Sequence, residues 1–266
     1  MKSEAVFYKV VGSNILLTYP LELEFVHIQE GVFIMGSDNK LDPEAEEHEK
    51  PQHNVYLPEF FISKFLITNT IYKDFTQSTN YPLPKPWGNE FPYEKGDHPV
   101  RGTSWYGAFD FCEWLSEKTN LNILLPSEAE WEKTARGSDG IIYPWGNKNP
   151  KHAYLNYNEY VGGTTPVGKY SPKGDSPYGV TDLCGNVWEW TRSIWGELGS
   201  FSDFEYPYNP YDGREKFDKT FHWMIVRGGG YKANRKYIRC AARDKENPSY
   251  DLSIGFRVVL QIDKMN

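Results

Sequence analysis

Apolar residues recur at helical spacing in three segments of the chain, and each segment begins beside a residue that can cap a helix. After Ser104, apolar side chains repeat every three or four positions, at Trp105, Ala108, Phe109, Cys112 and Leu115. Thr68 precedes a second helical pattern near 69–77. The third begins with Ser127 and Glu130 in the spacing of a capping box. The sequence therefore predicts three helices.

Strand-like alternation is clearest in YGVTDLCGNVWEWTR, residues 178–192. Alternation places Trp188 and Trp190 on one face of a strand and Glu189 on the other. The residues alone favour a glycine-rich turn before a core strand, with Glu189 hydrogen-bonded. They also allow an alternative, in which the carboxylates of Asp182 and Glu189 and the turn carbonyls surround a hard cation such as calcium.

The rest of the chain has short strands and long irregular connections. Residues 23–37 suggest two strands around a turn, and 225–261 suggest three strands separated by loops. The stretch 81–99 is punctuated by proline and predicts a loop, and 193–223 is an aromatic-rich insertion. The acidic segment 42–57 contains histidines but no HExxH spacing, so we interpret it as a solvated loop. No repeat or linker divides the chain, which favours one domain.

Composition and charge exclude several classes of function. The net charge of −7 gives no attraction to nucleic acid or to anionic membranes. No apolar run approaches the ~18 residues of a membrane span, and Glu4 interrupts the segment where a signal peptide needs an apolar core. Three cysteines, without a CxxC pair, argue against a disulfide framework or a zinc site. We expect a cytoplasmic protein.

Several phrases occur together in a specific order. They are GVFIMGS, EKPQHNV, HPVRGTSWYGAFDFCEWL, LPSEAEWEKTARG, YPWGN, TTPVG, GNVWEW, RGGGY, RCAAR and GFRVV. From about residue 23 to residue 261 the chain thus resembles the formylglycine-generating enzyme family, also called the sulfatase-modifying factor family. The resemblance implies an α+β domain of the C-type-lectin-like fold, with few helices, short strands and much irregular loop. Residues 1–22 would be an N-terminal extension and 262–266 a tail.

The resemblance also implies two structural calcium sites. Carried over to this sequence, the ligands of the first are Asp182, Glu189 and the carbonyls of Gly185 and Val187. The ligands of the second are Asn156, Glu159 and the carbonyls of Tyr157 and Val161.

The chain departs from the family's enzymes at the catalytic loop. Those enzymes oxidise a substrate cysteine with oxygen and a copper(I) ion, held by two cysteines just after an RGGS-like strand. The corresponding loop here is YKANRKYI, residues 231–238, which has no cysteine and follows Gly230 instead of serine. Soft thiolates select copper(I), so we expect no copper and no formylglycine generation.

The other cysteines do not replace that pair in the sequence. The resemblance assigns Cys112 and Cys240 to halves of disulfides whose partner positions are Val258 and Ala135 here. An alternative remains, in which another chain completes a metal-dependent oxidoreductase. This would be a formylglycine-generating enzyme or a sulfoxide synthase with non-haem iron, whose three histidine ligands come from an additional N-terminal domain.

A rigid scaffold without its redox metal can still present loops for recognition. Cations that suit carboxylates or phosphates lie in the C-terminal loop, at Lys232, Arg235, Lys236 and Arg243, and the polar amide of Asn234 lies among them, with Asp244, Lys245 and Glu246 beside them. Aromatic contact area lies in the insertion, at Trp195, Tyr206, Tyr208, Tyr211 and Trp223. We therefore predict a non-catalytic sensor or adaptor that binds a peptide, a protein or a small molecule. The simpler alternative is a solvated charged face beside aromatics that pack on themselves.

Overall fold

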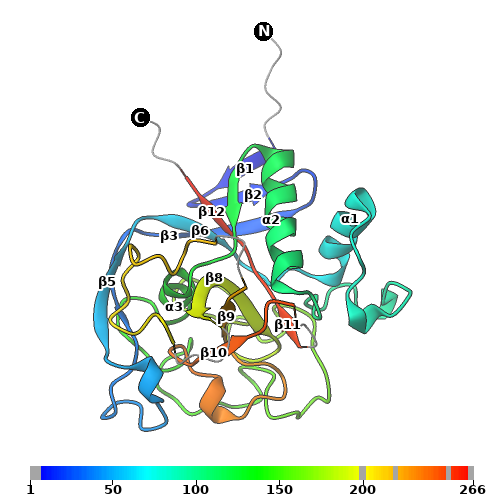
Figure 1. The fold of residues 1–266 in the computed structure, drawn as a ribbon. Coiled ribbons are helices and arrows are strands. Elements are labelled where there is room, and N and C mark those ends of the chain that lie inside the picture. The colour runs from blue at the N-terminus through cyan, green and yellow to red at the C-terminus, as the bar shows by residue number, and fades with distance from the viewer. Residues whose placement is uncertain (1–6, 198–201, 218–220, 250–252, 263–266) are drawn as a thin grey trace.

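The computed structural model describes residues 7–197, 202–217, 221–249 and 253–262. The ends of the predicted extension and tail, and parts of the predicted 193–223 insertion, lie outside these ranges. In Figure 1, β1 and β12 lie near α2, and α3 lies beside β8 toward the middle of the view.

The three predicted helices are present in the described chain. They are α1 (Asn69–Thr79), α2 (Trp105–Thr119) and α3 (Glu128–Arg136). Thr68, Ser104 and Ser127 each accept a hydrogen bond from the first turn of the helix that follows, and Glu130 completes the capping box. These local predictions are confirmed.

The largest sheet of the described residues has six strands in the order β1-β2-β3-β6-β12-β7, with antiparallel neighbours. The strands are β1 (Tyr8–Val11), β2 (Asn14–Leu17), β3 (Leu23–Ile28), β6 (Phe60–Ser63), β12 (Val259–Gln261) and β7 (Asn122–Leu124). β12 therefore fills the space between β6 and β7, far from both in sequence.

Two smaller sheets complete the architecture. The order β10-β9-β8-β11 joins β8 (Trp188–Gly196), β9 (Trp223–Arg227), β10 (Arg243–Glu246) and β11 (Ile254–Gly255). A hairpin joins β4 (Gly31–Met35) to β5 (His53–Leu57). Short 3₁₀ turns are η1 (Glu47–Glu49), η2 (Lys85–Trp87), η3 (Tyr93–Lys95) and η4 (Arg235–Tyr237). The mixture of few helices, short strands and long irregular segments is the predicted α+β class.

β8 is the core strand that the alternation predicts, but both of its faces are buried. Trp190 donates its Nε1–H to the Thr103 carbonyl in the larger apolar cluster. On the other face Glu189 is also fully buried, where it pairs with Arg257. The strand therefore separates an apolar layer from a polar layer.

Buried ion pairs are the feature that sequence patterns did not predict. Glu128 pairs with Arg214 and Arg243, and Glu132 pairs with Arg227. The arginines lie far from α3 in the sequence, so these ion pairs hold α3 against β9, β10 and the segment around Arg214.

The described helices include none that is both long enough and apolar enough to cross a bilayer.

Candidate functional site

The loop in the position of the family's copper site packs closely on the start of β8. Gly229 has φ +70°, and a Cβ there would lie 2.7 Å from the Tyr237 carbonyl oxygen. Gly230 faces Trp188, whose ring also meets Tyr237 edge-on. Glycines at this turn permit a backbone approach that side chains would obstruct.

Two cysteine side chains close to this loop in the fold contact each other. Cys184 and Cys240 are buried, free and within hydrogen-bonding contact of each other. Burial raises the pKa of the Cys184 thiol well above its ordinary value, and the neighbouring Cys240 raises it further. The Cys184 thiol is therefore protonated at neutral pH, whereas copper binding needs thiolates. No pattern in the sequence indicates that these two cysteines are in contact.

Each proposed disulfide half shares an apolar cluster with the position that the resemblance gives for its partner. Cys240 and Ala135 belong to one apolar cluster, and Cys112 and Val258 to another. All three cysteines are free thiols.

The first predicted calcium turn already has protein partners for its carboxylates. Arg257 donates to Glu189 from Nε at 2.6 Å and from Nη2 at 3.0 Å. Asp182 accepts from the Gly168 amide at 2.6 Å, and burial raises the pKa of its carboxyl to about 6. Val187 donates its amide to the Gly185 carbonyl. This arrangement is the hydrogen-bonded core turn that the residue types alone favour.

The second predicted calcium turn contains an oxygen without a partner. Asn156 is buried and donates from Nδ2 to the Gly163 carbonyl, while its Oδ1 has no donor among the described residues. Glu159 points elsewhere, since it is mostly exposed and lies 3.5 Å from Lys232. Tyr157 is half-buried, and Val161 is exposed. The side chain of Asn156 therefore fits an oxygen-seeking cation better than that of Glu159 does.

Most of the predicted cationic face is balanced by acidic residues. Arg235 lies 3.4 Å from Glu44, and Lys236 contacts Glu46. Asn234 instead caps η4, because its Oδ1 accepts from the Lys236 amide. These contacts pin the acidic segment to the C-terminal loop. The acidic segment is therefore not the solvated loop that the sequence predicts.

Three predicted ligand residues come together with Lys245 in one cavity of about 430 Å³, which we call the His48 pocket. Its lining residues are Glu47, His48, Lys50, Trp195, Ser202, Glu205, Tyr206, Arg243 and Lys245. β8 supplies Trp195, β10 supplies Arg243 and Lys245, and η1 supplies His48. His48 belongs to the acidic segment that the sequence predicts to be a solvated loop, and its place in this pocket was not predicted. Charge complementarity between the 42–50 and 235–245 segments was the available signal.

Arg243 contacts several of the residues that line this pocket. Its guanidinium lies 5.1 Å from the Trp195 ring and 4.5 Å from the Tyr206 ring. Its Nη1 donates to the His48 carbonyl and its Nη2 to Glu128, and its backbone carbonyl lies 3.0 Å from His48 Nε2. Its Nε and the Trp195 Nε1 are buried N–H groups with no acceptor in the described chain.

The remaining predicted aromatic residues lie outside the lining. Tyr208 is buried, and its hydroxyl donates to Glu215 at 2.6 Å. Trp223 lies beneath the Lys245 ammonium, 5.8 Å from its ring centre. Tyr211 is 90% exposed.

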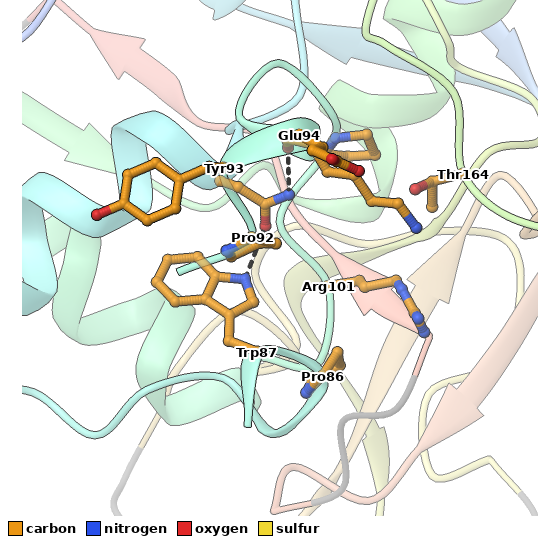
Figure 2. A pocket seen from close by; sticks show the side chains of 10 residues that line it. Pro86, Trp87, Pro92, Tyr93, Glu94, Arg101 and Thr164 are labelled. Carbon is orange, nitrogen blue, oxygen red and sulfur yellow. Dashed lines mark hydrogen bonds between the residues drawn. The ribbon is translucent and has the colours of Figure 1, made fainter. Parts of the chain in front are cut away.

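A second cavity, of about 350 Å³, lies in the proline-punctuated stretch between α1 and α2. Figure 2 shows Trp87 and Tyr93 on one side of it and Arg101 and Thr164 on the other. The Trp87 indole donates to Asn69, which donates in turn to the Lys95 carbonyl. These polar groups already have partners, so the cavity indicates a ligand less directly than the His48 pocket does.

Comparison with known proteins agrees with the architecture and the order of motifs. The model of the sulfatase-modifying factor enzyme 1-like domain matches residues 19–262. The chain belongs to the sulfatase-modifying factor family. This family member is 28% identical to the mouse formylglycine-generating enzyme over 300 residues, covering 90% of this chain and 75% of the enzyme.

The chain is also similar to an oxygenase and to a protein of known structure. The hercynine oxygenase of Mycolicibacterium smegmatis is 26% identical over 84% of this chain and 58% of its own length. The solved structure of PvdO from Pseudomonas aeruginosa is 25% identical and superimposes with a TM-score of 0.72, covering 91% of this chain and 95% of its own. The family member described here thus has the C-type-lectin-like fold that its sequence predicts.

Proposed function

We propose that this member of the sulfatase-modifying factor family is a non-catalytic module that binds a small ligand in the His48 pocket. One observation carries the proposal: Trp195, Tyr206 and Arg243, which the sequence nominated for recognition, line a single cavity. Concave sites with aromatic walls and a few buried polar groups are typical of small-molecule binding. The lack of cysteine in the 231–238 loop supports the non-catalytic part of the proposal.

Binding is tested by equilibrating the protein with a small-molecule extract of the native host and identifying retained compounds by mass spectrometry. We expect Trp195→Ala to lose a compound that wild type and Tyr211→Ala retain, because Tyr211 lies outside the pocket. Equal retention by all three proteins would contradict binding at this site.

Catalysis is tested by an anaerobic copper(I) titration and an aerobic assay of thiol-peptide oxidation. We expect weak copper binding and no aldehyde, because the 231–238 loop has no cysteine and burial raises the pKa of the Cys184 thiol. Aldehyde formation by wild type would overturn the non-catalytic proposal.

The Cys184–Cys240 contact favours one alternative, an oxidoreductase that holds its metal with these two sulfurs. Copper binding that disappears in Cys184→Ser and Cys240→Ser, and persists in Cys112→Ser, would support it. Cys112 is the matched control because it is also a buried free thiol.

We further propose a structural calcium ion at the turn around Asn156. The support is the buried Asn156 Oδ1, for which the described chain offers no donor. At the Asp182 and Glu189 turn the proposal is weaker, since Arg257 already neutralises Glu189.

A further inference from the structure

We propose that a third cavity, beside α2, binds a small primary ammonium ion that carries an apolar body. The cavity has a volume of about 280 Å³, and we call it the Phe109 pocket. It is lined by residues of α2, by Leu124 and Leu125, and by Arg192, Glu215 and Phe217. It shares no lining residue with the His48 pocket, so this inference goes beyond the proposed function and does not depend on it.

One side of α2 supplies the first wall of the pocket. Trp105, Phe109 and Glu113 are spaced four residues apart, so they lie on the same side of the helix. Trp105 is buried, Phe109 is half-buried and Glu113 is exposed. All three line the pocket, which therefore extends from the apolar core to the surface along this side of α2.

Phe217 completes an aromatic wall. Its ring centre lies 4.7 Å from that of Trp105 and 5.5 Å from that of Phe109, and the Trp105 and Phe109 rings stack at 5.3 Å. Leu124 and Leu125 add aliphatic lining. Because the face of an aromatic ring attracts a cation within about 6 Å of its centre, this wall suits both the charge and the apolar body of an ammonium ligand.

The charges at the pocket are negative in sum. Arg192, the cation of the lining, donates to both oxygens of Glu130, at 2.6 and 3.1 Å, and its Nε lies 3.4 Å from Glu215. One guanidinium is therefore shared by two carboxylates. Glu113 has no ion pair among the described residues. These three carboxylates and one guanidinium sum to −2, so a cation would be attracted and an anion repelled.

Glu215 does not decide the sign of this charge. Its Oε1 accepts from the Ser193 and Tyr208 hydroxyls at 2.7 and 2.6 Å, while burial raises the pKa of its carboxyl. With Glu215 protonated, the same four groups still sum to −1. Its side chain lines the pocket and is 16% exposed, so a ligand can approach it.

A small primary amine matches this combination of walls and charge. Its ammonium group has three N–H donors for carboxylate oxygens, and its body can lie against the rings. The volume of about 280 Å³ is just below the usual range for drug-sized ligands, which favours a small molecule.

Isothermal titration of the full chain with 2-phenylethylammonium, 2-phenylethanol and phenylacetate tests the proposal. The three probes share a phenyl ring and a two-carbon chain and differ in charge. We expect the ammonium to bind about ten-fold more tightly than the alcohol, and phenylacetate to bind more weakly than both. Equal binding of the alcohol would overturn the cation site, tighter binding of phenylacetate would overturn its sign, and no binding of any probe would overturn the pocket as a ligand site.

Two substitutions on α2 locate the site. Glu113→Gln removes one lining charge from an exposed side chain, and we expect about a two- to five-fold loss of 2-phenylethylammonium affinity with the alcohol unchanged. Glu117→Gln is the matched control, because Glu117 is also exposed on α2 and lies outside the lining. An equal loss in both variants would contradict the assignment to this pocket.

A third variant tests the aromatic wall. Phe109→Leu keeps an apolar side chain but removes one aromatic face, so the preference for the ammonium over the alcohol should decrease by about three-fold. Urea unfolding of the same variant checks that the fold is retained. An unchanged preference in the folded variant would contradict contact between the cation and this ring.

Discussion

His53 joins two parts of the molecule through both nitrogens of its ring. Its Nδ1 lies 2.8 Å from the Pro51 carbonyl, and its Nε2 accepts the Tyr208 amide at 2.7 Å. A doubly protonated ring has no lone pair for the Tyr208 amide. Burial lowers the pKa of His53, which agrees with a neutral ring in the folded protein.

This geometry predicts an acid-sensitive contribution to stability. The folded-state pKa of His53 lies below the unfolded value of about 6.5, so the unfolded chain takes up the proton first. Stability from His53 is therefore complete above that value and decreases as the pH falls below it. Urea unfolding at pH 7.5, 6.5 and 5.5 should show a smaller decrease for His53→Gln than for wild type. Equal pH dependence would contradict the prediction.

A change of charge at Glu189 should strongly reduce stability. Both of its oxygens accept from Arg257, and both side chains are fully buried. Glu189→Gln leaves the guanidinium buried without its counter-charge, so we expect a loss of about 3–5 kcal/mol in the free energy of unfolding.

Glu159→Gln is the matched control for that substitution. Its ion pair with Lys232 has both side chains more than 60% exposed, so the change should stay within about 0.5 kcal/mol. Denaturant unfolding measures both values. A similar loss in the two variants would exclude a special role for the buried pair.

At the scale of elements, α3 depends on its first turn. The Ser127 hydroxyl accepts the Glu130 amide at 3.0 Å, and Glu130 returns a bond to the Ser127 amide at 2.8 Å. Ser127→Ala should reduce the free energy of unfolding by about 1 kcal/mol. Ser78→Ala at the exposed end of α1 removes a hydroxyl that donates only to the Phe75 carbonyl, which also accepts from the Thr79 hydroxyl, and it should have little effect in the same urea titration.

The sequence predicted the features that depend on near neighbours. The caps of α1, α2 and α3 act over three residues, and the alternation of β8 acts over two, so both are visible in the sequence. The Glu128–Arg243 pair joins residues 115 positions apart, and the Cys184–Cys240 contact joins two separate turns. Such contacts depend on topology, which a pattern in one chain does not encode. The His48 pocket was therefore predicted only in part. Residue type indicates its aromatic and cationic residues, whereas His48 was predicted to lie in a solvated loop and reaches the pocket only through the topology.

At the scale of the whole molecule, a bound calcium ion would stabilise only the folded state. At a calcium concentration about 100 times the Kd, stability should rise by about 2.7 kcal/mol, which corresponds to about 5–10 °C in Tm for a chain of this size. Melting in calcium and in a chelator measures the shift.

Two variants decide which turn is responsible for that shift. Asn156→Ala should abolish it, because the turn loses the oxygen that lacks a partner. If Asn156→Ala keeps the shift and Asp182→Asn loses it, the ion belongs to the first turn instead. An identical melt in calcium and chelator would remove calcium from the proposal.

β12 has a consequence for synthesis on the ribosome. It enters the six-stranded sheet between β6 and β7, although about 200 residues separate it from β6. At translation speeds of roughly 5–20 residues per second that interval lasts roughly 10–40 s, during which the edge of β6 that β12 will occupy stays unpaired. We expect the nascent chain to depend on holdase chaperones until its last strand emerges, and a stop codon just before Val259 to yield aggregates rather than a shorter folded domain.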